Sequence, residues 1–295
     1  MKKLVPIVIA LAIAAMAILG CVAWLFVKHA VCPSSYEELI ALPDRELAHV
    51  DIARMNLLCA QGLLGAENLN VDQSLATLDR WAKIAMQAER KYSPQYSQNS
   101  DRYDNSYAKF KAVNLALTLK QDLRCGYNIN LVASGSMADI RTTSFFRNSK
   151  DLFLHGFTEK RTGSCSSLPV LMVAVGRRCG YPLYLVACKG HLFCRWDDGK
   201  EQFNIETAMQ GVDSKPDSYY RTWPHPSTDT EVRQEKYLKT LTPAEELGIF
   251  AQLRAACLQE NGRFQESADV YRVALRSFPE SQMLQAYLAN VKGRN

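Results

Sequence analysis

The stretch RTGSCSSLPVLMVAVGRRCGYP, Arg161 to Pro182, is the part of the sequence that decides the fold. Its small polar residues lead into an apolar run whose hydrophobic residues recur at helical spacing. Pro169 falls near the start of this run, where a missing N–H costs little because the first N–H groups of a helix are unpaired anyway. Gly180 is suited to end a helix, and Pro182 prevents it from resuming. The stretch therefore predicts one buried helix.

Cys165 lies at the N-terminal edge of this predicted helix, which either Ser164 or Ser166 can cap. Unpaired N–H groups and the positive end of the helix dipole stabilise a thiolate there, which makes the sulfur a usable nucleophile. The same N–H groups could receive the oxyanion that forms when a thiolate attacks a carbonyl. For any single cysteine, the alternative is a small buried residue with no chemical role.

Three short β-rich runs follow the helix. They read YPLYLVAC, HLFCRW and QFNIET, and they are separated by Lys189-Gly190 and by DDGK at residues 197–200. Both separators have the composition of hairpin turns. We therefore predict three antiparallel strands packed against the helix, which makes the central part of the chain an α+β domain.

His191 begins the second of these strands and is the candidate that would take a proton from Cys165. Residues 191, 193 and 195 share one face of the strand, so His191 points at the helix if that face is turned inward. A third group should hold the imidazole in place. Asn204 and Glu206 lie two residues apart on the next strand, and either side chain could reach the ring.

The order of these residues resembles the transglutaminase-like superfamily of papain-type thiol enzymes. GSCSSLPVLMVAVGRRCGYPLYLV, KGHLFCRW and FNIET look most like a bacterial branch described only as transglutaminase-like, whose members often end in a tetratricopeptide-like helix pair. The resemblance is strong over residues 151–211 and looser over the helical flanks. It implies a papain/transglutaminase-like core, in which the nucleophile helix packs on a small antiparallel sheet.

The resemblance also implies a role for each residue of the site. Cys165 would be the nucleophile and His191 the general base, and Glu206 stands where the family usually has Asp, with Asn204 as its rival. The expected activity is a cysteine hydrolase or acyltransferase that acts on amide bonds of a peptide or protein. No upstream glutamine stands out as an oxyanion-hole residue. The alternative is an inactive member that keeps the fold and binds a peptide or protein partner.

A metal site is the rival interpretation of the same residues. Cys188, His191 and Cys194 form C-x-x-H-x-x-C, and Cys165 would complete a set of four zinc ligands. Because side chains alternate between the two faces of a strand, however, ligands at steps of three are divided between those faces. We therefore predict neither a metal nor a cofactor.

The N-terminal segment predicts attachment to a membrane. Residues 4–27 contain no charge and are preceded by two lysines, which favours a cytoplasmic N-terminus and an exported domain. ILGC, ending at Cys21, also resembles a lipoprotein cleavage box, but the sequence stays apolar after it, so an uncleaved anchor is preferred. The nine cysteines permit disulfides in an exported protein, although their pairing does not follow from the sequence.

The charge of the chain gives no indication of nucleic-acid binding. Three of the 35 basic residues lie in the first 31 residues, which leaves 32 basic against 30 acidic residues elsewhere. Affinity for a polyanion needs clustered lysine and arginine, whereas here they are interspersed with acidic residues. We therefore expect a peptide or protein substrate, and no nucleic acid.

The chain divides into five predicted segments. These are an anchor (1–31), a helical region (32–126), the transglutaminase-like core (127–217), a Pro-rich connection (218–240) and a tetratricopeptide-like helical segment (241–295). In the helical region, Asn70 with Gln73 opens a helix that should run to about Tyr92, and residues 91–107 read as a loop. In the last segment, a single repeat cannot bury both of its faces, so we expect it to pack on the main domain or on a protein partner.

Overall fold

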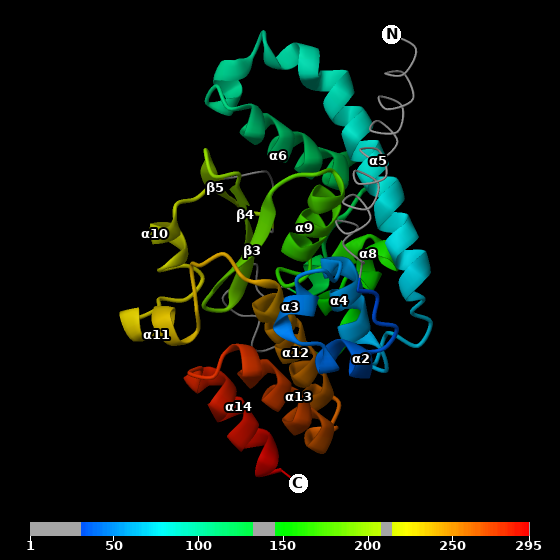
Figure 1. Cartoon of the computed structure of the whole chain (residues 1–295), viewed down its shortest axis with the longest axis vertical. Helices are drawn as coiled ribbons and strands as arrows, with labels where there is room; N and C mark the ends of the chain where they lie inside the picture. The colour runs from blue at the N-terminus through cyan, green and yellow to red at the C-terminus, as the bar shows by residue number, and fades with distance from the viewer. Residues whose placement is uncertain (1–30, 132–144, 208–213, 295) are drawn as a thin grey trace, which may run out of the picture.

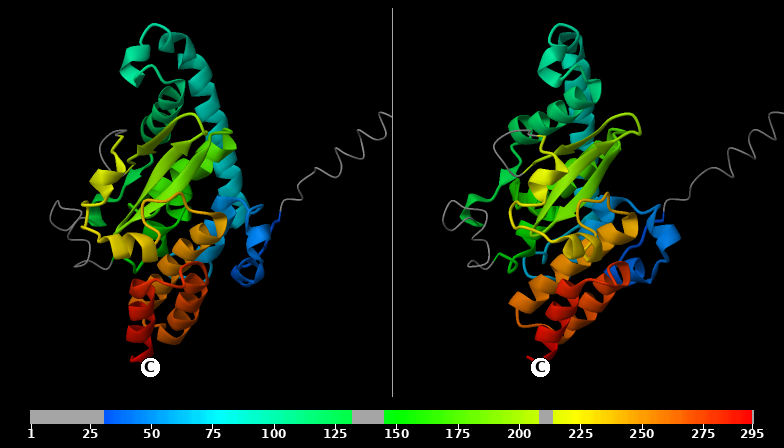
Figure 2. Two further views of the ribbon diagram at one scale, coloured as in Figure 1. Left: turned by 60° about the vertical axis from the view of Figure 1, so that its left-hand side comes forward. Right: turned by 90° about the vertical axis from the view of Figure 1, so that its left-hand side faces the viewer.

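The structure is a computed structural model, and it describes residues 31–131, 145–207 and 214–294 (Figure 1). Its sheet consists of β3 (Leu183–Cys188), β4 (His191–Asp197) and β5 (Gln202–Ile205), antiparallel and in that order. Cys188 pairs with His191, and Cys194 pairs with Ile205. Figure 2 shows the sheet in the middle of the molecule, between the α5–α6 hairpin and the C-terminal helices. The predicted three-stranded sheet and the α+β fold class are confirmed.

Helix α9 (Leu168–Arg178) is the predicted helix, and it packs on the sheet through an almost entirely buried apolar face. Gly180 follows it in the left-handed region, at φ +77°. The Tyr181 N–H donates to the Gly176 carbonyl (2.9 Å), and the Gly180 N–H donates to the Arg177 carbonyl (3.0 Å). These two bonds form a Schellman motif, which a residue with a side chain would strain. The predicted end of the helix is therefore confirmed.

The part of the described chain before the site is mainly helical. It contains α2 (Tyr36–Ala41), α3 (Asp44–Leu47), α4 (Ile52–Ala60), α5 (Val71–Tyr96), a 3₁₀ turn (Ser100–Tyr103), α6 (Tyr107–Leu117) and a π-helical turn (Thr118–Asp122). The Asn70 side chain accepts a hydrogen bond from the Gln73 N–H (2.9 Å) and caps α5, as predicted.

The prediction of a loop over residues 91–107 is partly wrong. Helix α5 continues past Tyr92 to Tyr96. The Tyr96 ring packs against Tyr107 and Phe110 of α6, with ring centroids 5.1 and 5.4 Å apart. These aromatic contacts stabilise the additional helical turn, and the polar composition of the segment conceals them.

Small elements connect the helical region to α9. Strands β1 (Gly126–Tyr127) and β2 (Thr162–Gly163) form a parallel pair. Between them in the chain lie a 3₁₀ turn (Ile129–Leu131), α7 (Ser149–Leu152) and α8 (His155–Lys160). The β1–β2 pair brings Tyr127 opposite Gly163, just before the turn that contains Cys165.

The C-terminal part begins with two short helices, α10 (Asp217–Tyr220) and α11 (Asp229–Gln234), within the predicted Pro-rich connection. Helices α12 (Pro243–Glu260), α13 (Phe264–Ser277) and α14 (Gln282–Lys292) follow and pack successively at the lower end of Figure 1. Gly262, at φ +75°, makes the turn between the first two. The sequence thus correctly predicts two helices around this turn, and α14 follows them; their likeness to a tetratricopeptide repeat stays a prediction.

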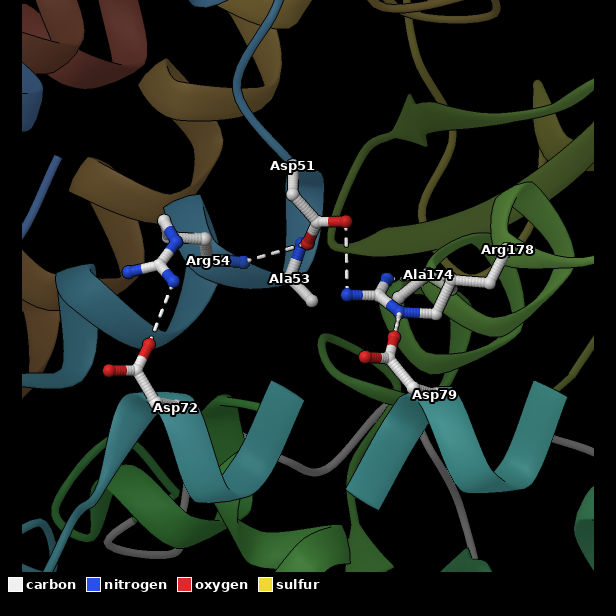
Figure 3. Close-up of polar contacts among 7 residues, drawn as sticks. All are labelled: Asp51, Ala53, Arg54, Asp72, Asp79, Ala174 and Arg178. Atoms are coloured by element: carbon white, nitrogen blue, oxygen red, sulfur yellow. Dashed lines mark hydrogen bonds and ion pairs between the residues drawn. The ribbon is translucent and has the colours of Figure 1, made fainter. Parts of the chain in front are cut away.

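Ion pairs join α9 to the helices around it. Arg178 contacts Asp51, just before α4, at 3.0 Å and Asp79 on α5 at 2.7 Å (Figure 3). Arg177 makes two hydrogen bonds to Glu246 on α12, at 2.7 and 3.2 Å. The last turn of α9 is therefore tied to N-terminal and C-terminal helices alike.

One apolar core connects these parts of the molecule. Its buried members come from α2 and α4, α9, the sheet and α12 to α14, from Tyr36 to Val291. The eight cysteines in the described residues are free thiols. Among the described residues, no helix is both long and apolar enough to cross a membrane, and the expected anchor lies almost entirely in residues 1–30, outside them.

Candidate active site

The candidate site lies at one end of the sheet, where β4 begins and β5 ends. His191 is the first residue of β4, and Glu206 directly follows β5. Gly190, at φ +81°, makes the turn that directs the chain into β4. Cys165 lies in the turn before α9. The three residues come from different segments and meet because α9 packs along the sheet.

The prediction that Ser164 or Ser166 caps the helix is wrong in detail. Helix α9 starts at Leu168, with Ser167 as its N-cap, and no side chain caps it. Instead, Ser167 Oγ accepts from the Ser164 N–H (2.9 Å) and donates to the Asp151 carbonyl (3.1 Å). Cys165 therefore occupies a hydrogen-bonded turn just before the helix, and its side chain is held in the core with 5% of the residue exposed.

His191 and Glu206 form a buried pair. His191 Nε2 lies 2.9 Å from Glu206 Oε2, and neither side chain is exposed to solvent. The Tyr220 hydroxyl donates to the same carboxylate oxygen at 3.2 Å. Two partners therefore fix the position of the Glu206 carboxylate, which in turn holds the imidazole ring.

The Cys165 thiol lies near the same ring. His191 Nδ1 makes no hydrogen bond of standard geometry to any described residue, and it is buried. Burial alone would lower the pKa of His191, but hydrogen bonding and charge from Cys165 and Glu206 outweigh burial and raise it to about 9. The Cys165 thiol and the Glu206 carboxylate therefore both stabilise the imidazole in its charged form.

Asn204, the rival third residue, does not reach His191. Its side-chain oxygen accepts a hydrogen bond from Arg195 Nε (2.8 Å), and its nitrogen donates to Asp217 Oδ1 (2.7 Å). Asn204 thus belongs to a polar cluster that joins β4, β5 and the start of α10. Of the two alternatives, Glu206 is the one that contacts the imidazole.

Aromatic residues cover the face of the sheet that carries His191. The condition that the face of residues 191, 193 and 195 turns toward the helix is not met, because α9 packs against the opposite face through Cys194. The Tyr220 ring stacks on Phe193 with centroids 3.7 Å apart, and the Trp223 ring lies 4.9 Å from His191. The Tyr-Trp composition of residues 218–223 was the only sequence signal for this cover.

The structure confirms that the candidate zinc ligands Cys188 and Cys194 lie on opposite faces of the sheet. The Cys188 thiol points to the Trp223 carbonyl (3.7 Å) on the His191 face, whereas the Cys194 thiol donates to the Pro169 carbonyl (3.2 Å) on the opposite face. Within the described residues, no group of three or more histidine, cysteine or acidic side chains could hold a metal ion.

The His191 imidazole contacts the Glu206 carboxylate and lies near the Cys165 thiol, at one end of an antiparallel sheet on which a helix packs. Comparison with protein families shows that residues 140–252 match the transglutaminase-like superfamily, a superfamily of thiol enzymes. These residues therefore form a transglutaminase-like core domain that contains Cys165, His191 and Glu206. No curated protein and no solved structure matches the chain.

Proposed function

We propose that the protein is a thiol-dependent amide hydrolase or acyltransferase, with Cys165 as nucleophile, His191 as acid and base, and Glu206 as the residue that orients the imidazole. One observation carries the proposal, namely that the buried His191 ring contacts the Glu206 carboxylate at 2.9 Å and has its pKa raised by the nearby Cys165 thiol. A protonated imidazole next to a thiolate is the form in which such a site is ready to react.

The proposed reaction proceeds through a thioester. Cys165 sulfur attacks the amide carbonyl, and the carbonyl electron pair moves to oxygen. When that pair returns, the C–N bond breaks and the amine leaves with a proton from His191. Water or a second amine then attacks the thioester and gives its proton to His191. The C–S bond breaks and the thiolate of Cys165 leaves, which gives hydrolysis when water attacks and transfer when the second amine attacks.

Selective labelling of Cys165 tests the proposal. Burial raises the pKa of the thiols of Cys59, Cys125, Cys179, Cys188, Cys194 and Cys257, so these should react slowly near neutral pH. We expect iodoacetamide at pH 7 to label Cys165 rapidly, and mass-spectrometric mapping separates it from the exposed Cys32.

The His191→Ala variant provides the decisive comparison. It should slow the labelling of Cys165 by about tenfold or more. His49→Ala, a matched change at an exposed histidine, should leave the rate unchanged. Equal rates in the wild-type protein and the His191→Ala variant would contradict the proposed function.

A binding module without activity is the second candidate function. The small exposed fraction of Cys165, 5%, and the complete burial of the His191 side chain favour it. Such a module would hold a peptide or protein partner, and its Cys165 would react with iodoacetamide at the rate of an ordinary buried thiol. The labelling experiment therefore distinguishes the two functions.

We also propose that the protein is a bacterial membrane-anchored protein with its domain exported. The uncharged residues 4–27 and the preceding lysines support this location. The Cys21→Ser variant separates the two forms of attachment. If the protein is a lipoprotein, the variant no longer incorporates radiolabelled palmitate. If the protein has an uncleaved anchor, the variant stays in the membrane fraction.

We also propose that the tetratricopeptide-like helices α12 and α13, with α14, offer a surface for a protein partner.

A further inference from the structure

The Tyr127 side chain is placed beside Cys165 by the backbone. The Gly126 N–H donates to the Arg161 carbonyl (2.9 Å), and the Asn128 N–H donates to the Gly163 carbonyl (2.8 Å). These bonds fix Tyr127 opposite Gly163, two residues before Cys165. The short parallel pair of β1 and β2 thus connects a distant part of the chain to the turn that carries the thiol.

The hydroxyl of Tyr127 is buried and makes no hydrogen bond of standard geometry with any described residue. A buried hydroxyl without a partner is unfavourable and uncommon, so it calls for an explanation. Burial, the nearby thiol of Cys165 and the charge of Asp151 raise the pKa of Tyr127, while the Cys165 N–H acts in the opposite direction. The hydroxyl therefore keeps its proton and lies near both the sulfur and the N–H of Cys165.

We propose that the Tyr127 hydroxyl and the backbone N–H of Cys165 together receive the oxyanion that forms when Cys165 attacks a carbonyl. This inference rests on the proposed function. The attack forms the S–C bond and moves the carbonyl electron pair to oxygen, and Tyr127 donates a hydrogen bond to that oxygen without losing its proton. When the pair returns and the leaving group departs, the hydroxyl is again without a partner. Tyr127 thus supplies a side-chain donor in a sequence where no upstream glutamine stands out for this role.

Two reagents that react at the same sulfur test this role. Acylation of Cys165 by p-nitrophenyl acetate passes through an oxyanion, whereas alkylation by iodoacetamide does not. In the full chain, Tyr127→Phe should slow acylation by about tenfold or more, because one oxyanion donor typically contributes about 100-fold or more. The same variant should change alkylation less than twofold.

Tyr36→Phe is the matched control, since the Tyr36 hydroxyl is also buried and without a hydrogen-bond partner among the described residues. It should change neither rate. Equal acylation rates for Tyr127→Phe and the wild-type protein, or equal slowing of both reactions, would overturn the inference. His191→Ala should slow both reactions, and if it slows neither, it is the proposed function that fails.

Discussion

His191 and Glu206 contact each other at 2.9 Å through Nε2 and Oε2, from the start of β4 and the end of β5. Both side chains are fully buried, so no solvent screens the interaction. The contact therefore affects the stability of the fold, and its contribution depends on the protonation of His191.

The stability of the protein should fall as the pH rises from about 6.5 to about 9. The pKa of His191 is raised from 6.5 to about 9 on folding, so the stabilisation is complete below the lower value and is lost through the higher one. The loss should be up to about 3 kcal/mol in the free energy of unfolding. Urea unfolding at pH 6 to 9 measures it. Glu206→Gln should show a weaker pH dependence, and an unchanged slope would contradict this assignment.

Asn204→Ala should separate fold stability from thiol reactivity. It removes the hydrogen bonds to Arg195 and Asp217, and we expect a loss of about 1–3 kcal/mol in the free energy of unfolding. Because Asn204 does not contact His191, the rate of Cys165 alkylation should remain within twofold of the wild-type rate. The exposed Asn68 provides a control, since Asn68→Ala should change neither quantity. A large fall in the alkylation rate would restore Asn204 as a residue that orients His191.

Arg177→Ala should destabilise the connection between α9 and α12. The Glu246 side chain is 1% exposed, and the change leaves its carboxylate buried without its partner. Removing one partner of a buried ion pair lowers the free energy of unfolding by about 3–5 kcal/mol. We expect a loss near about 3 kcal/mol here, because the Arg177 side chain is 31% exposed. Arg272→Ala removes an exposed ion pair with Asp269 and should cost less than about 1 kcal/mol. Thermal unfolding should rank the two variants in this order.

Gly180→Ala should weaken the end of α9. No described residue lies within 4 Å of an added Cβ, so the cost comes from the backbone at φ +77° and should be about 1 kcal/mol. Gly293→Ala, at φ −78° after α14, should be close to neutral. If the two variants unfolded at the same temperature, the left-handed conformation of Gly180 would carry no energetic cost.

Local sequence signals predicted the helix and strands that build the core. Pro169, Gly180 and Gly190 act within a few residues, so their effect on the chain can be predicted from the sequence. The face of β4 that α9 covers depends on packing between distant segments, and alternation along the strand cannot decide it. The sequence therefore predicted these elements, whereas it left open which face of β4 turns toward the helix.

The details of the site depended on contacts between residues far apart in the chain. Asn204 and Glu206 lie on the same face of their predicted strand, so the sequence does not show which of them contacts His191. The structure decides it, because the Asn204 side chain is hydrogen-bonded to Arg195 and Asp217 instead. Tyr127 was missed because its position beside Cys165 follows from the β1–β2 pair, whose two-residue strands leave no recognisable pattern in the sequence. Such contacts become visible only once the segments are assembled.

The segment that matches the family ends inside helix α12, so it does not coincide with a part of the chain that could fold by itself. Residues 140–252 stop within a helix whose buried residues, Phe250 and Ala255 among them, lie on both sides of that boundary. A fragment cut there would lose α4 and α13, against which α12 packs, and would expose apolar surface that the whole chain covers. The segment that matches the family is thus smaller than the unit that folds, and the flanking helices are part of what makes this segment foldable.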